Sequence, residues 1–315
     1  KDGSVITWGG TAVHQYPENQ SHLKINNIVS TLASFAALRA DGSVVCWGTI
    51  DNNSIPSDLN EGITQIYSND YSFAGLKNDG SVITWGYQSN LYKWLNEDYE
   101  SAGSNSALVA NQLKSGVKNI YCNQVSFAAL KNDGSVITWG DSRYGGDSSS
   151  VALELKSGVK SVYANQKAYA ALKDDGSVVT WGDFQNGGSS FPVQSQLQSG
   201  VVDIVGNNYA FAALKSDGSV VCWGNEKYGG DKNIWGSDFI STDTQENIEF
   251  LLSNGVKSIS SINNSFAAIK DDGSVVFWGQ KLLYKPSKQD NHSFFNFADP
   301  NLNEELITYQ NQITL

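Results

Sequence analysis

The residue types that most often perform chemistry are few in this sequence of 315 residues, and their spacing does not suit catalysis. Its three histidines, His14, His22 and His292, do not stand at the short spacing of paired metal ligands. The sequence contains no nucleophile elbow, no phosphate-binding loop and no cysteine–histidine dyad. We therefore predict no catalytic residue, no metal site and no cofactor.

Aspartate recurs in seven Asp-Gly pairs and could be considered as a general acid or base. Because Asp-Gly is primarily a turn-forming pair, we interpret these aspartates as turn residues. The Gly-Gly pair of YGGD (144–147) lacks the Lys-Ser that follows a phosphate loop, so we interpret it as a plain turn.

The three cysteines are an odd number without paired spacing. Cys46 and Cys222 occupy the same position of a repeated motif, SVVCWG, and equivalent positions of different repeats should lie too far apart for a disulfide. We interpret all three, including Cys122, as small buried residues of a protein in a reducing compartment.

The formal net charge is −11, from 32 acidic and 21 basic side chains, and no cluster of Lys and Arg is present. Nucleic-acid binding needs such a cluster, so we expect no nucleic-acid partner, although an acidic surface could steer a basic protein. No apolar run approaches the roughly 18 residues of a membrane-spanning helix. We expect a monomeric, folded protein whose true N-terminus, with any targeting signal, lies upstream of Lys1.

The strongest pattern is a repeat, D-G-S-V-[VI]-x-W-G, which occurs seven times. Its turn glycines are Gly3, Gly42, Gly80, Gly134, Gly176, Gly218 and Gly273, with spacings of 39, 38, 54, 42, 42 and 55 residues. A period of this length is typical of propellers, solenoids and repeat arrays.

Each complete repeat reads as a series of short strands. An apolar segment such as SFAALKN (126–132) precedes Asp-Gly, and the β-branched segment SVITW follows it, which is a strong hairpin signal. A third segment such as KNIYCNQ (118–124) precedes the hairpin, and we expect a fourth strand after it, for example VALEL (151–155). Four strands per unit predict an all-β fold, a seven-bladed β-propeller built from four-stranded antiparallel blades.

A tryptophan stands in the same position of every repeat and is predicted to anchor the blade core. Burying one indole contributes about 4–6 kcal/mol at most. The residues are Trp8, Trp47, Trp85, Trp139, Trp181, Trp223 and Trp278.

The combination of FAAL, DGSVxTWG and the Gly-rich segments GDSRYGGD (140–147), GDFQNGGS (182–189) and GNEKYGGD (224–231) resembles the regulator of chromosome condensation repeat. The resemblance covers essentially residues 1–280 and implies a seven-bladed propeller that serves as a protein-interaction surface. Family members include regulators of small GTPases, secreted effectors of intracellular bacteria and a bacterial inhibitor of β-lactamase.

Some family features are missing. The Gly-rich segment is absent after Trp8, Trp47 and Trp85, and no sequence matches the wedge through which the chromatin-bound founder exchanges nucleotide on the GTPase Ran. The resemblance therefore assigns nucleotide-exchange activity to no residue of this sequence. There is also no basic tail for chromatin.

The predicted domain organisation is a propeller over residues 1–280 and a C-terminal tail over 281–315. The first repeat has its DGSVITWG arm without the FAAL arm, which would leave an open edge. We expect the segment 306–315 to pair with residues 4–8 and close the first blade.

Two insertions lengthen the repeat by 12 and 13 residues and are rich in aromatic residues, which dominate binding hot spots. The alternative is that these aromatics cover a blade, and the tail motif HSFFNF (292–297) poses the same choice. The segment TDTQENIEFLL (242–252) is predicted to contain a short helix. The candidate partner-binding residues are Tyr87, Tyr92, Trp94, Tyr99, Trp235 and Phe239.

The function that these features favour is a non-enzymatic interaction propeller, a bacterial effector or adaptor, secreted into the host cytosol, that binds a host protein such as a small GTPase. The GTPase and the bacterial origin come from the resemblance. One alternative is a guanine-nucleotide exchange factor for a Ran-like or Rab-like GTPase. Another is a proteinaceous enzyme inhibitor.

Overall fold

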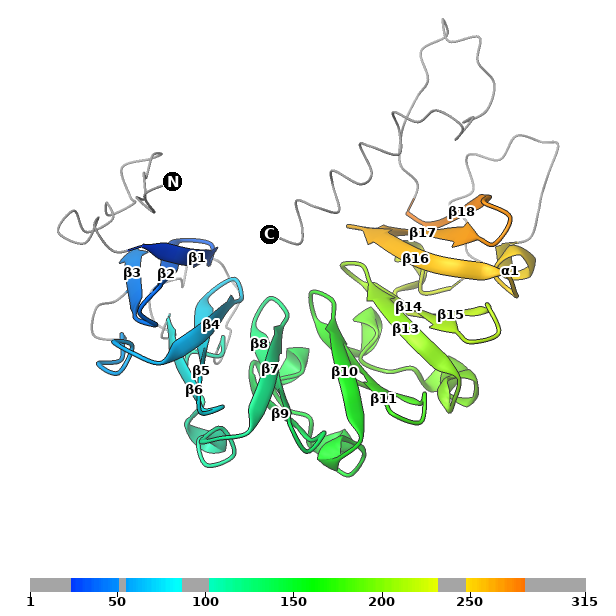
Figure 1. Ribbon diagram of the computed structural model, residues 1–315. Coiled ribbons are helices and arrows are strands. Elements are labelled where there is room, and N and C mark those ends of the chain that lie inside the picture. The colour runs from blue at the N-terminus through cyan, green and yellow to red at the C-terminus, as the bar shows by residue number, and fades with distance from the viewer. Residues whose placement is uncertain (1–23, 51–54, 87–101, 232–247, 281–315) are drawn as a thin grey trace, which may run out of the picture. The chain divides into compact units, whose positions relative to one another are not determined.

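The computed structural model describes residues 24–50, 55–86, 102–231 and 248–280, all of which belong to one unit, Lys1–Gln280. These residues form six three-stranded antiparallel sheets in a propeller-like, all-β fold, and neighbouring sheets pack side by side in chain order (Figure 1). We number the sheets blades 1 to 6. The strands are β1 (Ile25–Ser30), β2 (Ser34–Arg39) and β3 (Val44–Gly48) in blade 1; β4 (Ile63–Ser68), β5 (Ser72–Lys77) and β6 (Val82–Gly86) in blade 2; β7 (Val117–Cys122), β8 (Ser126–Lys131) and β9 (Val136–Gly140) in blade 3; β10 (Val159–Ala164), β11 (Ala168–Lys173) and β12 (Val178–Gly182) in blade 4; β13 (Val201–Gly206), β14 (Ala210–Lys215) and β15 (Val220–Gly224) in blade 5; and β16 (Val256–Ile262), β17 (Ser265–Lys270) and β18 (Val275–Gly279) in blade 6.

The blades differ from the prediction in number and in composition. The described residues form six blades of three strands, not seven of four, and the first repeat, with Trp8, lies outside the described residues. The prediction of a fourth strand was wrong. The segment 151–155 instead overlaps two 3-10 turns, η6 (Ser149–Val151) and η7 (Glu154–Lys156). Val151 and Leu155 are four residues apart, so a helical turn can direct both at the core cluster between blades 3 and 4.

The predicted hairpins are present, and their turns are well defined. In blade 4, Leu172 pairs with Val178, and the turn between them contains Asp175 and Gly176. The Asp175 carboxylate accepts hydrogen bonds from the backbone N–H and the hydroxyl of Ser177, at 2.9 and 2.6 Å, and Gly176 has a φ of 77°. These hydrogen bonds hold the pKa of Asp175 below its ordinary value of 3.8.

The middle strands of blades 2 to 5 are buried on both faces, as the absence of alternation in FAAL predicted. Ala168, Ala170 and Leu172 of β11 pack with blade 5, whereas Tyr169 and Ala171 of the same strand join the cluster shared with blade 3. The three alanines and the tyrosine of 168–171 are fully buried where the blades meet. The small alanine side chains therefore let adjacent sheets approach closely.

Two sets of backbone hydrogen bonds join consecutive blades. At one end, the N–H of Val201 donates to the carbonyl oxygen of Gly176 at 3.0 Å, and a Cβ on Gly176 would lie only 2.8 Å from the nitrogen of Gly200. At the other end, the turns between the first two strands of each blade are linked in series. Their N–H···O distances are 3.1 Å for Asp70 to Gln124, 3.2 Å for Gln124 to Gln166, 3.4 Å for Gln166 to Asn208 and 2.9 Å for Asn208 to Asn263.

Blade 6 differs from the others because the described residues leave one of its faces uncovered. Ile269 and Phe277 are 46% and 47% exposed, whereas their counterparts in blade 5, Leu214 and Cys222, are 9% and 4% exposed. A Cβ on Gly273 would meet no atom within 4 Å. The tail 281–315 and its closing segment 306–315 lie outside the described residues, so the predicted closure stays a prediction.

The predicted helix is present at α1 (Ile248–Leu251). None of the helices in the described ranges has the length and apolarity that a membrane-spanning segment requires.

Candidate interaction surface

The residues predicted to bind a partner all lie in segments that the structure does not describe. These are Tyr87, Tyr92, Trp94, Tyr99, Trp235 and Phe239, and the three histidines also lie outside the described ranges. Among the described residues, no group of three or more His, Cys, Asp and Glu side chains is placed to hold a metal ion. All three cysteines are free.

The repeated tryptophans that the structure describes are buried in the blade cores. Each indole is 5% exposed or less and stacks on the aromatic residue paired with it across the sheet, with ring centroids 5.1–5.4 Å apart. The pairs are Phe35–Trp47, Phe73–Trp85, Phe127–Trp139, Tyr169–Trp181, Phe211–Trp223 and Phe266–Trp278.

The segment that joins two blades, here called the connector, begins with the Gly-rich motif that follows a tryptophan strand and is more than a plain turn. In the connector between blades 4 and 5, Asp183 accepts a hydrogen bond from the N–H of Asn186 at 3.0 Å, and Gly187 has a φ of 97°. The side-chain amide of Asn165 donates to the carbonyl oxygen of Asn186 at 2.6 Å, and the indole of Trp223 donates to that of Gly187 at 3.1 Å. The connector is thus fastened both to its own blade and to the next one.

The same two fastenings recur along the chain. The indole nitrogens of Trp139 and Trp181 donate to Gly103 and Gly145, each at 3.1 Å. The buried amides of Asn123 and Asn207 donate to the carbonyl oxygens of Tyr144 and Tyr228, each at 2.6 Å. Sequence reasoning missed these asparagines, although their recurrence in CNQ, ANQ and GNN was a visible signal.

The connector between blades 4 and 5 displays two phenylalanines to solvent. Phe184 is 74% exposed and Phe191 is 79% exposed. The connector between blades 3 and 4 has the same length, and Ser142 and Ser149 stand in the two equivalent positions. Because the fold accepts serine there, it does not require the two phenylalanines.

The lysines at the ends of the middle strands have structural partners. The Nζ atoms of Lys131, Lys173 and Lys215 donate to the backbone carbonyl oxygens of Gln112, Glu154 and Gln196 at 2.8, 2.6 and 2.8 Å.

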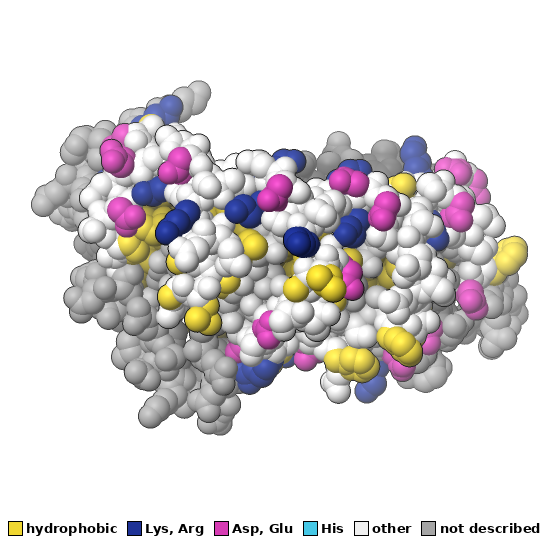
Figure 2. All heavy atoms as spheres, turned by 90° about the horizontal axis from the view of Figure 1, so that it is seen from below, with side chains coloured by type: hydrophobic (Ala, Val, Ile, Leu, Met, Phe, Trp, Pro, Cys, Tyr) yellow, Lys and Arg dark blue, Asp and Glu magenta, His cyan; other side chains and the backbone are white. Residues whose placement is uncertain are grey.

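Figure 2 shows Lys and Arg side chains interspersed with Asp and Glu on one face, and hydrophobic side chains in separate spots between them. This face therefore carries no uniformly basic patch.

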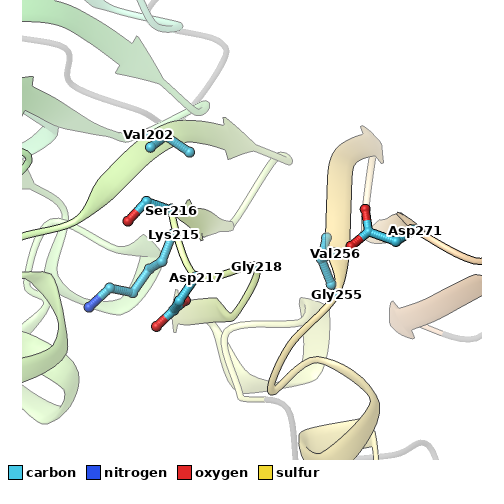
Figure 3. A pocket seen from close by; sticks show the side chains of 8 residues that line it. All are labelled: Val202, Lys215, Ser216, Asp217, Gly218, Gly255, Val256 and Asp271. Atoms are coloured by element: carbon cyan, nitrogen blue, oxygen red, sulfur yellow. The ribbon is translucent and has the colours of Figure 1, made fainter.

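A shallow depression lies between blades 5 and 6 (Figure 3). Its lining includes Lys215, Asp217 and Asp271 together with the backbone of Gly218 and Gly255. Asp217 already accepts two hydrogen bonds from Ser219, at 2.9 and 2.6 Å, and Lys215 is bonded to a carbonyl oxygen. Lys215 and Asp217 are thus committed to turn structure, so the depression is a poor candidate for an active site.

The family comparison matches residues 201–229, which include all three strands of blade 5, to the regulator of chromosome condensation (RCC1) repeat. This match confirms the resemblance drawn from the repeated residues. A bacterial origin is not tested by it. No curated protein sequence matches the chain.

Several solved structures are similar in fold. The CRINKLY WD40 ectodomain of the receptor kinase ACR4 from Arabidopsis thaliana is 17% identical, with a TM-score of 0.41 and 84% of each chain covered. Prp20p from Saccharomyces cerevisiae is 16% identical, with a TM-score of 0.44 over 84% of this chain and 73% of Prp20p. Human WBSCR16 is 17% identical, with a TM-score of 0.44 over 82% of this chain and 76% of its own. At such identities and TM-scores, these structures do not specify a partner or an activity.

Proposed function

We propose that this RCC1-repeat protein is a non-enzymatic interaction propeller that binds another protein through Phe184 and Phe191. The observation that carries the proposal is the exposure of two phenylalanines on a connector whose backbone is hydrogen-bonded to both of the blades that it joins. Large aromatic residues supply much of the energy of protein interfaces. A connector already fixed in one conformation loses little entropy when a partner binds.

The comparison of equivalent positions supports a functional reading of these side chains. An exposed phenylalanine contributes little to the stability of the free protein, and serine occupies both positions one blade earlier. These two aromatic side chains are therefore free to contact another molecule, and aromatic residues are enriched among those that dominate binding energy.

The partner that the RCC1 repeat suggests is a small GTPase. The yeast structure with this repeat is described by its binding to Gsp1p and histones. For the present chain, a GTPase partner is a proposal, and nucleotide exchange is an outcome that the same experiment detects.

The test uses the full chain and a panel of small GTPases loaded with a fluorescent guanine nucleotide. Binding without faster nucleotide release, abolished by Phe184→Ser combined with Phe191→Ser, would support an adaptor. Phe250→Ser is the matched control, because Phe250 is 72% exposed but belongs to α1. Accelerated release would overturn the non-enzymatic proposal, and binding that survives the double substitution would overturn the assignment of the surface.

A further inference from the structure

The sequence contains two Asn-Gly pairs, and the structure places them in different surroundings. Asn254-Gly255 lies in the turn between α1 and β16, where the Asn254 side chain is exposed. Asn186-Gly187 lies in the connector between blades 4 and 5, where Asn186 is only 9% exposed. Asparagine is a thermolabile residue, and a glycine after it leaves its side chain open to attack by the backbone, because glycine has no Cβ to block the approach.

The reaction that such a pair undergoes is deamidation. The backbone nitrogen of the glycine loses its proton to solvent and attacks Cγ of the asparagine. A bond forms between this nitrogen and Cγ, and the side-chain amide nitrogen leaves as ammonia. Water then opens the resulting succinimide ring at either carbonyl group, which gives aspartate or isoaspartate. The net reaction consumes water and releases ammonia.

A lysine is placed to promote this reaction at Asn254. The Nζ atom of Lys270 donates to the backbone carbonyl oxygen of Asn254 at 2.6 Å and to that of Leu251 at 2.5 Å. The Asn254 carbonyl and the Gly255 nitrogen belong to one conjugated peptide unit, so negative charge on the nitrogen is shared with the oxygen that the ammonium contacts. A hydrogen bond from a cation stabilises that charged form and eases loss of the Gly255 proton.

The side chain of Asn254 is also loosely held. Its amide donates only to the hydroxyl of Ser253 among the described residues, at 3.2 Å, and Ser253 is itself exposed. Gly255 lines the shallow depression between blades 5 and 6 (Figure 3), so water reaches this turn. The Asn254 side chain can therefore turn toward the Gly255 nitrogen at little cost.

The structure restrains Asn186 instead. Its side-chain amide and its backbone N–H both donate to the carboxylate of Asp183, at 2.6 and 3.0 Å. Its carbonyl oxygen accepts a hydrogen bond from the uncharged amide of Asn165 at 2.6 Å, not from a cation. To attack Cγ, the nitrogen of Gly187 would need the Asn186 side chain to leave Asp183.

We propose that Asn254 is a site of spontaneous deamidation that Lys270 promotes, and that the fold protects Asn186. The fold does not require asparagine at this position. Serine precedes the equivalent glycines of blades 3, 4 and 5, which are Gly116, Gly158 and Gly200.

The product would alter the junction of blades 5 and 6. The N–H of Val256 donates to the carbonyl oxygen of Gly218 at 2.9 Å, and a Cβ on Gly218 would lie only 2.7 Å from the nitrogen of Gly255. Isoaspartate lengthens the backbone by a methylene group in this tightly packed turn. We therefore expect the modified protein to be less stable than the unmodified one.

The experiment incubates the full chain at neutral pH, with and without urea, and follows both asparagines by peptide mass spectrometry. In the native protein, Asn186 should react about tenfold more slowly than Asn254, which corresponds to the loss of about one hydrogen bond. In urea the two rates should be similar, because both pairs are Asn-Gly. Equal rates in the native protein, or reaction of Asn254 in urea alone, would overturn the proposal.

Lys270→Gln tests the part played by the ammonium group. This substitution should slow the reaction of Asn254 in the native protein about tenfold and leave the rate in urea unchanged. Lys131→Gln is the matched control, because Lys131 makes the equivalent bond to Gln112 in blade 3, where no Asn-Gly pair is present. An unchanged native rate in Lys270→Gln, or an equal fall in both variants, would overturn the role of Lys270.

Asn254→Ser tests the effect on the junction, because serine occupies this position in blades 3 to 5. After the same incubation, the Tm of the unsubstituted chain should fall by about 2–4 °C, and the Tm of Asn254→Ser should not change. An equal change of the Tm in both proteins would show that deamidation of Asn254 does not weaken the junction.

Discussion

The indole nitrogen of Trp181 in blade 4 donates to the carbonyl oxygen of Gly145, 3.1 Å away in the connector from blade 3. Gly145 has a φ of 95°, and a Cβ at this position would lie 2.7 Å from the ring of Tyr169. One glycine thus allows both the reversal of the connector and its contact with the stacked pair Tyr169–Trp181.

Replacing Gly145 should therefore destabilise the protein in two ways. We expect Gly145→Ala to lower the free energy of unfolding by about 2–4 kcal/mol, through the positive φ and the steric conflict. Gly62→Ala is the control, because Gly62 has a φ of 78° but its Cβ would meet nothing closer than 3.7 Å. Its cost should be about 1 kcal/mol. The free energy of unfolding of each variant would be measured by urea denaturation. Equal losses for Gly145→Ala and Gly62→Ala would show that the contact with Tyr169 is unimportant.

The buried side-chain amide of Asn165 allows a test of the hydrogen bond that ties the connector to its own blade. Asn165→Asp keeps the acceptor for the N–H groups of Lys167 and Ala168 but replaces the donor to Asn186 with a carboxylate oxygen. The expected loss of unfolding free energy is about 2–3 kcal/mol. Asn208→Asp, at the adjacent turn position that Asp70 occupies in blade 2, should cost less than about 1 kcal/mol. A similar cost for both would argue against the bond to Asn186.

The Asp-Gly turns should make stability fall at low pH. The pKa values of six turn aspartates, including Asp175, are lowered mainly by the hydroxyl and N–H of the following serine. A lowered folded-state pKa means that this stability is present above the ordinary value of 3.8 and is lost as the pH falls through the folded values. In a carboxyl NMR titration, Ser177→Ala should move the pKa of Asp175 back toward 3.8 and leave that of Asp133 unchanged. An unmoved Asp175 would contradict the assigned cause.

Cys46 and Cys122 should react slowly in the folded protein. Burial is the main cause that raises both pKa values to about 11. At pH 8 a thiol with that pKa is ionised in about one molecule in a thousand, and the thiolate is the reactive form. Labelling with a thiol-reactive disulfide reagent should be slow in buffer and fast in urea. Rapid labelling of either residue in the native protein would show that these thiols are accessible and ionised.

Deletion of residues 301–315 tests the predicted closure. The uncovered face of blade 6 exposes Ile269 and Phe277, and covering it would bury apolar surface. If the segment 306–315 closes the first blade by pairing with residues 4–8, as predicted, the deletion should lower the Tm sharply. An unchanged melting temperature would indicate that another segment supplies the closing strand.

The repeat alone determined the hairpins, the buried tryptophan position and the all-β class. This succeeded because turn chemistry and strand preference act between residues close in sequence, and seven copies repeat the same signal. An Asp-Gly turn is stabilised by residues next to it in the sequence, as the hydrogen bonds between Asp175 and Ser177 show.

Only the tertiary structure decided how the blades are joined and what remains exposed. The bonds from Trp181 to Gly145 and from Asp70 to Gln124 connect residues 36 and 54 positions apart, and no local pattern specifies them. The segment 151–155 had strand-like composition, but its place between two blades favoured a helical turn that buries Leu155. The exposure of Phe184 became visible for the same reason, because burial depends on which segments the fold brings together.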